Sequence, residues 1–117
     1  MIWRSLFRGF IQLHILYHAS EQPTYGAWLI EELGRHGYSL SPGTLYPILH
    51  RLEKDGLLTS SYQVVDGKRR RYYAITPAGE EALAQARRQA IELVTEIAPE
   101  QMASRGQDTQ KQENAKP

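Results

Sequence analysis

Two groups of side chains in this sequence could contact nucleic acid. The first lies on segment 41–55, where apolar residues recur at helical spacing and the opposite face carries hydrogen-bonding and basic side chains. The second is the run of four consecutive basic residues at 68–71. The major groove of B-DNA admits one α-helix, whose outward side chains reach base edges, and nearby lysines and arginines contact phosphates. Together the two groups predict a helix that reads DNA and a basic segment beside it.

The outward face of segment 41–55 offers donors and acceptors of hydrogen bonds. Its polar members are Thr44, Tyr46, His50, Arg51 and Lys54. Pro47 lies on the same face, about two turns inside the expected helix, where it removes one backbone hydrogen bond and crowds a carbonyl at a cost of roughly 3 kcal/mol. A proline inside the expected helix either marks a functional position or means that the regular helix begins only near Pro47. The residues alone leave both interpretations open.

The basic run at 68–71 lies where an extended segment is expected. Side chains alternate along a strand, so two of the four point to each face and at least two can contact phosphate. Lysine and arginine also protect exposed strand edges, but a basic helix next to the run favours phosphate contact. Local charge agrees with this choice. Although the chain carries a net charge of only +1, the stretch from Arg51 to Arg71 holds six basic and three acidic residues.

Other kinds of chemistry find little support. His14 and His18 have the four-residue spacing of paired metal ligands on a helix. No third ligand of a fitting type is placed near them in the sequence, and paired histidines on an apolar helix are more often packing residues. The absence of cysteine excludes thiolate metal sites, disulfides and cysteine nucleophiles, and no nucleophile–base pair or phosphate loop is present. We therefore expect no metal, no cofactor and no enzymatic activity.

The elements that must position the basic groups follow from periodicity and from capping residues. Four segments have helical patterns, namely 3–19, 25–37, 41–55 and 77–98. The last three begin at or directly after the start signals Thr24, Ser41-Pro42 and Thr76-Pro77. In the third helix the expected core face consists of Leu45, Ile48, Leu49 and Leu52, and Gly56 ends the helix. From Leu58 to Ile75, extended segments flank Asp66-Gly67, which predicts a β-hairpin with both turn residues at positive φ.

This order of elements is the layout of a winged helix-turn-helix. We assign the chain to the mainly α (α+β) class, with a two-stranded wing and a long C-terminal helix. Residues 1–76 form the expected DNA-binding domain, 77–98 the dimerisation helix, and 99–117 a tail too polar to order itself. No run approaches the ~18 apolar residues of a membrane span, so we expect a cytoplasmic protein that does not bind membranes.

A resemblance to a known family rests on four stretches. They are Gly37-Tyr38-Ser39-Leu40-Ser41-Pro42-Gly43-Thr44-Leu45-Tyr46-Pro47-Ile48-Leu49-His50-Arg51-Leu52-Glu53, then Gly56-Leu57-Leu58, Asp66-Gly67-Lys68-Arg69-Arg70-Arg71-Tyr72-Tyr73 and Ile75-Thr76-Pro77-Ala78-Gly79. Over residues 9–98 the chain resembles the PadR family. The Ser-Pro-Gly-Thr-Leu-Tyr-Pro stretch followed by an Arg-Tyr-Tyr wing strand distinguishes this family from other winged helices.

The resemblance implies a homodimeric bacterial transcriptional repressor, with helix 41–55 in the major groove and the wing, 64–72, on the backbone or minor groove. Its DNA-facing set is Ser41, Pro42, Gly43, Thr44, Tyr46, Pro47, His50 and Arg51, with Lys68, Arg69 and Arg70 at the wing; the helix face adds Lys54. One stretch departs from the family. Where relatives often have His-Gly-Tyr-Glu, this chain has Tyr25-Gly26-Ala27-Trp28, so Ala27 replaces a tyrosine that could contact DNA.

The first and last helices carry more apolar surface than one small domain can cover, which predicts a symmetric dimer. The expected interface consists of Phe7, Phe10, Leu83, Ala86, Ala90, Leu93, Val94 and Ile97. Some relatives bind aromatic effectors between these helices, and Trp3, Phe7 and Phe10 are the candidates for such a pocket, although we favour packing in the dimer core. Trp28 lies on the polar side of its helix, either as an isolated exposed residue or as a contact for a partner or DNA.

The predicted fold is compatible with two functions from different classes. The first is a regulator that binds a pseudo-palindromic DNA operator as a homodimer. The second is a winged-helix module that binds proteins without sequence-specific DNA recognition. The second predicts a depleted basic face, which Arg51, Lys54 and the run at 68–71 contradict. The sequence therefore favours the regulator.

Overall fold

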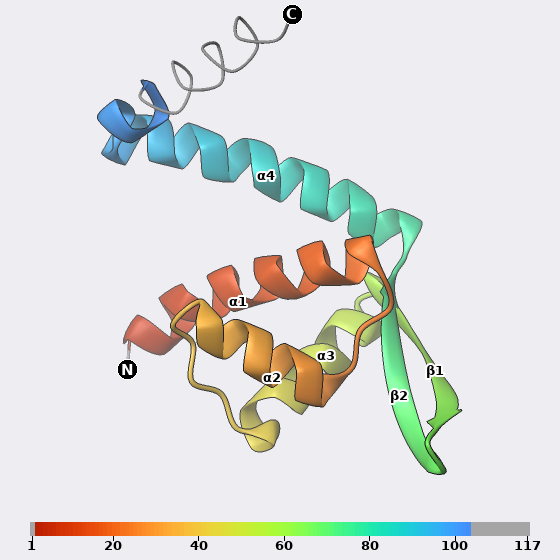
Figure 1. The fold of residues 1–117 in the computed structure, drawn as a ribbon. Coiled ribbons are helices and arrows are strands. Elements are labelled where there is room, and N and C mark those ends of the chain that lie inside the picture. The colour runs from red at the N-terminus through yellow and green to blue at the C-terminus, as the bar shows by residue number, and fades with distance from the viewer. Residues whose placement is uncertain (1, 104–117) are drawn as a thin grey trace, which may run out of the picture. The chain divides into compact units, whose positions relative to one another are not determined.

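The computed structural model describes residues 2–103 of the 117-residue chain, with side chains described from residue 4 onward. The elements follow the predicted order: three helices, a β-hairpin and a long helix (Figure 1). The described residues divide into two compact units, of which the first ends at Leu83 and the second begins at Ala84. The first unit contains the three helices, the hairpin and the start of the last helix, and it holds the buried core.

The core of the first unit lies between α1 (Ile2–Glu21), α2 (Gly26–Arg35), α3 (Pro42–Lys54) and the base of the hairpin. Its members are Ile11, Ile15, Leu16, Ala19, Leu29, Leu33, Leu45, Ile48, Leu49, Leu52, Leu58, Tyr73 and Leu83. The predicted core face of the third helix is confirmed, because all four of its leucine and isoleucine side chains are buried. Repeats three and four residues apart place them on one helix face.

The start of α2 differs from the prediction. Thr24 does not cap the helix, because Tyr25 occupies the cap position in an extended conformation and makes no side-chain cap bond. Thr24 instead bridges the backbone of Tyr73: its N–H donates to the Tyr73 carbonyl at 2.9 Å, and the Tyr73 N–H donates to the Thr24 carbonyl at 2.7 Å. This bridge satisfies two buried backbone pairs, whereas a cap would satisfy one amide. The α1–α2 connection is thereby attached to the sheet.

The start of α3 is confirmed, and its proline lies in the helix interior. The helix runs without a break from Pro42 to Lys54, so the interpretation that it begins near Pro47 is wrong. Ser41 occupies the cap position, but its hydroxyl lies 3.3 Å from the Thr44 hydroxyl and makes no cap bond to an amide. The Pro47 ring is exposed, on the side of α3 away from the core. The missing hydrogen bond therefore occurs on the surface, where water can solvate the unpaired carbonyl.

The hairpin forms as predicted. Strand β1 (Leu58–Val65) pairs antiparallel with β2 (Lys68–Ile75), from Leu58 opposite Ile75 to Val65 opposite Lys68. Both turn residues adopt positive φ, 54° at Asp66 and 76° at Gly67, as a two-residue hairpin turn requires. In Figure 1 the hairpin base adjoins the helices and its turn projects away from them.

Helix α4 (Pro77–Ile97) begins with the predicted cap. The Thr76 hydroxyl accepts the Gly79 N–H at 3.0 Å and donates to the Gly56 carbonyl at 2.6 Å. Leu83 ends the part of α4 that belongs to the first unit, and it is a member of the core. This burial corrects its assignment to a dimer interface, because a side chain enclosed by its own domain has little surface left for a partner.

The second unit is described from Ala84 to residue 103. Along α4, Ile91, Leu93 and Ile97 are exposed. A further helical turn covers residues 99–103, where we expected no regular structure. Proline fits the first turn of a helix, so Pro99 interrupts one helix and starts the next turn. The rest of the predicted tail, 104–117, lies outside the described residues. Among the residues that the structure describes, no helix has the length and apolar character needed to cross a membrane.

Candidate nucleic-acid interface

Helix α3 presents a stripe of side chains directly opposite its buried face. Gly43, Pro47, His50 and Lys54 succeed one another at intervals of four, three and four residues, and all are exposed. This spacing keeps them on one line along the helix. We call these four residues the α3 stripe. They include an imidazole and an ammonium group, which can donate to base edges or phosphates, and two residues whose small or rigid side chains allow close approach.

Tyr46 lies on one flank of the stripe and contacts the protein itself. It is 38% exposed, and its ring covers the backbone of Gly26 at the start of α2. A Cβ atom at Gly26 would lie 2.5 Å from the Tyr46 hydroxyl oxygen, so only glycine leaves room for the ring. The Tyr46 ring is 6.4 Å from that of His50. This packing fixes one helix of the helix-turn-helix against the other.

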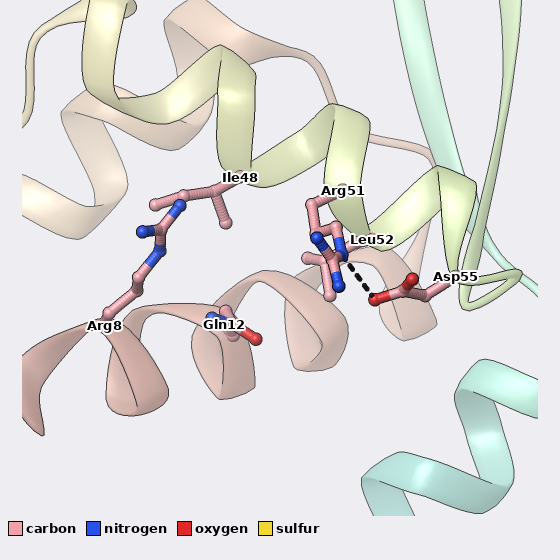
Figure 2. Close-up of a pocket in the computed structure, with 6 residues that line it drawn as sticks. All are labelled: Arg8, Gln12, Ile48, Arg51, Leu52 and Asp55. Carbon is pink, nitrogen blue, oxygen red and sulfur yellow. Dashed lines mark hydrogen bonds and ion pairs between the residues drawn. The ribbon is translucent and has the colours of Figure 1, made fainter. Parts of the chain in front are cut away.

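Arg51 lies on the other flank, toward α1. Its Nε donates to Oδ2 of Asp55 at 3.2 Å, and both side chains line a shallow groove of about 320 Å³. Figure 2 shows Arg8 and Gln12 of α1 on the opposite side of this groove. Arg51 therefore shares its surroundings with Arg8 rather than with His50. The ion pair with Asp55 is exposed and is easily exchanged for a contact with phosphate.

The beginning of α3 borders a larger groove of about 640 Å³. Arg4, Phe7 and Arg8 of α1 form one side, and the α2–α3 turn with Thr44 forms the other. Sequence reasoning missed the two arginines, although their four-residue spacing on a helix was a usable signal. Of the candidate effector residues, Phe7 lines this groove and Phe10 does not. The Trp3 side chain lies outside the described residues.

The basic side chains of the wing stack on tyrosines. The Arg69 guanidinium carbon lies 3.8 Å from the centre of the Tyr62 ring, and that of Arg70 lies 4.1 Å from the centre of the Tyr25 ring. Lys68, beside the turn, is exposed. Stacking holds the two guanidinium groups in place while their edges stay free to donate hydrogen bonds. The wing thus presents ordered positive charge on both of its faces.

Arg71 connects the wing to α3. Its Nη2 donates to Oε1 of Glu53 at 2.8 Å, and its Nε donates to Oγ of Ser60 at 3.0 Å. The Ser60 N–H and hydroxyl both donate to Oε2 of Glu53, at 3.0 and 2.7 Å. The hydrogen bond from the Ser60 side chain, reinforced by the Arg71 charge, lowers the pKa of Glu53 below its ordinary value. The sequence contained no signal for this network, whose members come from three elements.

A third histidine lies beside His14 and His18. His36, at the end of α2, brings a ring nitrogen to within 4.8 Å of nitrogens on both of the others. This arrangement overturns the expectation that no third ligand of a fitting type is nearby. His36 was overlooked because it follows His18 by 18 positions, and only the packing of α2 against α1 brings it there. This cluster lies apart from the α3 stripe, which contains His50.

The helix pair α2–α3, the hairpin that follows it and the basic side chains along both define a winged helix-turn-helix protein. The chain belongs to the transcriptional regulator PadR-like family, whose family model matches residues 15–85. It is therefore a transcriptional regulator and not an enzyme, as the sequence predicted, and regulation through DNA binding follows from family membership.

Relatives and solved structures agree with this assignment. Transcriptional regulator Rv3488 of Mycobacterium tuberculosis is 53% identical over 106 residues, which cover 91% of this chain and 99% of that protein. The crystal structure of a PadR family transcriptional regulator from Eggerthella lenta has a TM-score of 0.72 at 32% identity, covering 84% of this chain and 87% of the other. A PadR-like transcriptional regulator from Bacillus cereus has a TM-score of 0.74 at 30% identity, with 80% and 92% covered.

Proposed function

We propose that this protein is a cytoplasmic bacterial repressor that binds a pseudo-palindromic operator as a homodimer, with α3 in the major groove. The α3 stripe carries the proposal, because it offers exposed polar and basic groups along the face opposite the core. Of the predicted set, Ser41, Pro42, Gly43, Thr44, Pro47, His50 and Lys54 are all exposed and free to meet DNA. Tyr46 and Arg51 contact DNA from the two flanks.

The wing supplies contacts with the DNA backbone or minor groove. Lys68, Arg69 and Arg70 lie toward the turn end of β2, and the Arg71–Glu53 pair links that strand to α3. A wing held in this way keeps its cations at a constant distance from the reading helix. Phosphate contacts of this kind set position and affinity, and base contacts from α3 set specificity.

Exposed apolar surface on two helices supports a dimer. One helix is α1, in the first unit, and the other is the part of α4 in the second unit. On α1, Phe7 is 45% and Phe10 is 42% exposed. On α4, the stripe Ala86, Ala90, Leu93, Val94 and Ile97 is exposed or half-buried, and Ile97 is 69% exposed. We assign Phe7 and Phe10 to the dimer interface rather than to an effector pocket. A two-fold axis would place two α3 helices about one DNA turn apart, roughly 34–36 Å.

Repression needs only that the bound dimer occupies a promoter and excludes the polymerase. The experiment that tests the proposal measures the binding of fluorescent duplexes by anisotropy, comparing DNA upstream of the protein's own gene with a random duplex of equal length at two salt concentrations. We expect tighter binding to the upstream DNA and weaker binding to both duplexes at higher salt. A reporter gene under that promoter should fall in expression when the protein is present.

The same titrations on a variant with His50→Ala and Lys54→Ala test whether α3 reads the DNA. Both positions are exposed, so the two changes leave the core intact. Loss of selectivity in this variant supports α3 as the reading helix, and selectivity equal to wild type contradicts it. If the wild-type protein does not distinguish its upstream DNA from the random duplex at either salt concentration, autoregulation is wrong. If it binds neither duplex even at low salt, the protein-interaction function becomes the better account.

A further inference from the structure

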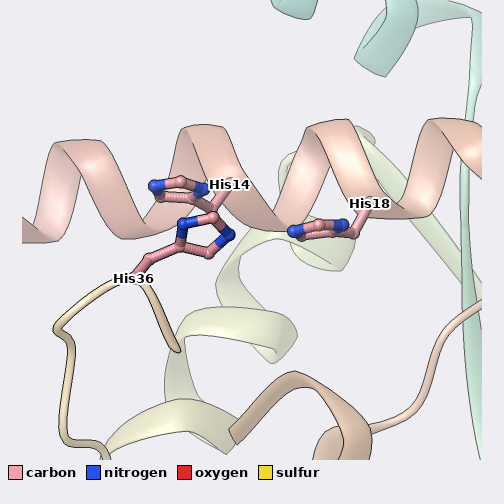
Figure 3. A group of neighbouring side chains, drawn as sticks. All are labelled: His14, His18 and His36. Atoms are coloured by element: carbon pink, nitrogen blue, oxygen red, sulfur yellow. The ribbon is translucent and has the colours of Figure 1, made fainter. Parts of the chain in front are cut away.

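Three of the four histidines in the chain converge at one place in the first unit. His14 and His18 come from successive turns of α1, and His36 follows the last residue of α2. Each offers a ring nitrogen within 4.8 Å of those of the other two, and Figure 3 shows the three rings side by side. The rings of His14 and His36 stack, with their centres 4.5 Å apart.

A carboxylate lies beside two of the three histidines. Oε1 of Glu32, one turn before His36, lies 3.4 Å from the Nε2 of His36 and 4.0 Å from the Nε2 of His18. The other oxygen, Oε2, faces Arg35 at 3.6 Å. One carboxylate oxygen is thus directed at the histidines while the other is held by a surface arginine. The side chain of Glu32 is largely buried, which limits its freedom to turn elsewhere.

The surroundings of the α1 histidines are partly buried. Burial, followed by the neighbouring histidines, lowers the pKa of His14, and burial also lowers that of His18 against the opposing effect of Glu32. The Nε2 of His18 is buried and has no hydrogen-bond partner among the described residues. A buried polar atom in this condition is costly unless something binds it.

We propose that His14, His18, His36 and Glu32 bind a divalent late first-row transition-metal ion, with zinc as the preferred occupant. Three imidazole nitrogens and one carboxylate oxygen form a tetrahedral donor set that suits zinc. Zinc–nitrogen bonds of about 2.0–2.1 Å require ligand nitrogens about 3.4 Å apart, so nitrogens that lie within 4.8 Å of one another move inward by at most about 1 Å. The stacked rings turn about their side-chain torsions to point their lone pairs at the ion. His36 has the freedom to turn, because its side chain is 42% exposed.

An ion at this place would join α1 to the end of α2, immediately before the turn that leads into α3. Binding free energy that is absent in the unfolded chain then adds to the stability of the first unit. The proposed metal site lies on α1 and α2, apart from the α3 stripe, and does not depend on which DNA the protein reads.

The test uses the full chain without any added histidine tag. Zinc chloride is titrated into the apoprotein by calorimetry, and cobalt(II) is added separately to record the visible absorption of a tetrahedral site. We expect one zinc ion per chain, an intense cobalt band and a rise in melting temperature with zinc. His36→Ala, at an exposed helix end, should weaken zinc binding by about tenfold or more, abolish the cobalt band and remove the rise in melting temperature.

His50→Ala is the matched control, because His50 lies on α3 outside the cluster and completes the set of four histidines. It should bind zinc and cobalt as the wild type does. Glu32→Gln should also weaken binding by about tenfold, because an amide oxygen is a poor zinc ligand. The proposal is overturned if the wild type shows no saturable zinc binding, or if His36→Ala binds zinc as tightly as the wild type does. Unchanged affinity in Glu32→Gln would refute the carboxylate ligand.

Discussion

On α3, the position of each polar residue around the helix axis decides what it can contact. His50 and Lys54 project opposite the core, whereas Tyr46 covers Gly26 and Arg51 pairs with Asp55. A helical face drawn from the sequence includes all four, because residues about 70° to either side of its centre look equivalent in a periodic pattern. The neighbouring elements divide them into a central stripe and two flanks. The residues of the stripe are therefore the sharpest probes of DNA recognition.

His50→Ala and Lys54→Ala should weaken DNA binding in two different ways. Losing an imidazole that meets a base edge should cost roughly 1–3 kcal/mol on the operator and nothing on a random duplex. Losing an ammonium group that meets phosphate should weaken both and reduce the slope of log K against log salt by about one. Anisotropy titrations at several salt concentrations separate the two results. Equal behaviour of the two variants on both duplexes would refute this division of roles.

Glu53 has a role in stability that depends on pH. Hydrogen bonds from Ser60, together with Arg71, lower the pKa of Glu53 in the folded protein, while the unfolded chain keeps the ordinary value of 4.5. Its contribution is therefore complete above about pH 4.5 and is lost as the pH falls through the lower, folded-state value. Glu53→Gln should reduce the free energy of unfolding by about 1–2 kcal/mol at neutral pH and by much less near pH 3.

Denaturant unfolding at the two pH values measures this difference. Glu81→Gln is the control, because Glu81 is exposed on α4 and has no hydrogen bond or ion pair among the described side chains. The control should match the wild type at both pH values. If Glu53→Gln destabilises the protein equally at neutral pH and near pH 3, the charge of Glu53 is not what stabilises the wing.

At the level of elements, backbone contacts join the helices to the hairpin. The Thr24–Tyr73 bridge attaches the α1–α2 connection to β2, and Thr76 both caps α4 and bonds the Gly56 carbonyl. At the same junction Gly79 lies against the Leu57 backbone carbonyl and the Ile75 side chain. The chain packs too closely there for any side chain. These three contacts hold the base of the wing against the helices, and so they set the angle between the wing and α3.

Replacing two helical glycines by alanine should have opposite effects. A Cβ at Gly79 would collide with the Leu57 carbonyl and approach Ile75 Cγ1 to 2.7 Å, so Gly79→Ala should lower the free energy of unfolding by about 1–3 kcal/mol. A Cβ at Gly34 in α2 meets nothing within 4 Å, so Gly34→Ala should raise it by roughly 0.5–1 kcal/mol. Thermal and denaturant unfolding measure both. A neutral Gly79→Ala would mean that the junction yields to the added methyl group.

The wing should act through charge alone. Changing Lys68→Ala and Arg69→Ala together should weaken binding to operator and random duplex alike and reduce the salt slope by about two, one for each phosphate contact. Gln63→Ala, an exposed uncharged change on the neighbouring strand, serves as the control and should leave the slope unchanged. A slope equal to wild type in the double variant would show that the wing does not touch the backbone.

At the scale of the whole molecule, the buried core ends at Leu83, while exposed apolar side chains continue along α4. Folding of the first unit therefore does not use the later part of α4, which leaves that part free to pair with a second copy. Removing the chain from Pro77 onward would also remove Leu83 from the core, so point changes beyond Leu83 test the dimer more cleanly. The choice of positions follows from where burial stops.

Leu93→Glu combined with Ile97→Glu should convert the proposed dimer into a folded monomer. Charges placed at a buried apolar interface are costly, and the core within residues 11–83 is untouched. Sedimentation velocity measures the mass, and circular dichroism shows that the helices persist. Arg88→Glu with Thr95→Glu puts two glutamates on the opposite face of α4 and should remain dimeric. An intact dimer in the Leu93/Ile97 variant would remove α4 from the interface.

The amino-acid sequence alone determined the order of elements, the core face of α3, the turn at Asp66-Gly67 and the cap at Thr76, because each depends on residues within a few positions of one another. Family membership was readable for the same reason. Only the tertiary structure decided that Thr24 bridges Tyr73, that Glu53 pairs with Arg71, and that His36 joins His14 and His18. Each of these contacts joins different elements, and their meeting depends on how helices and strands pack, which local propensity does not specify.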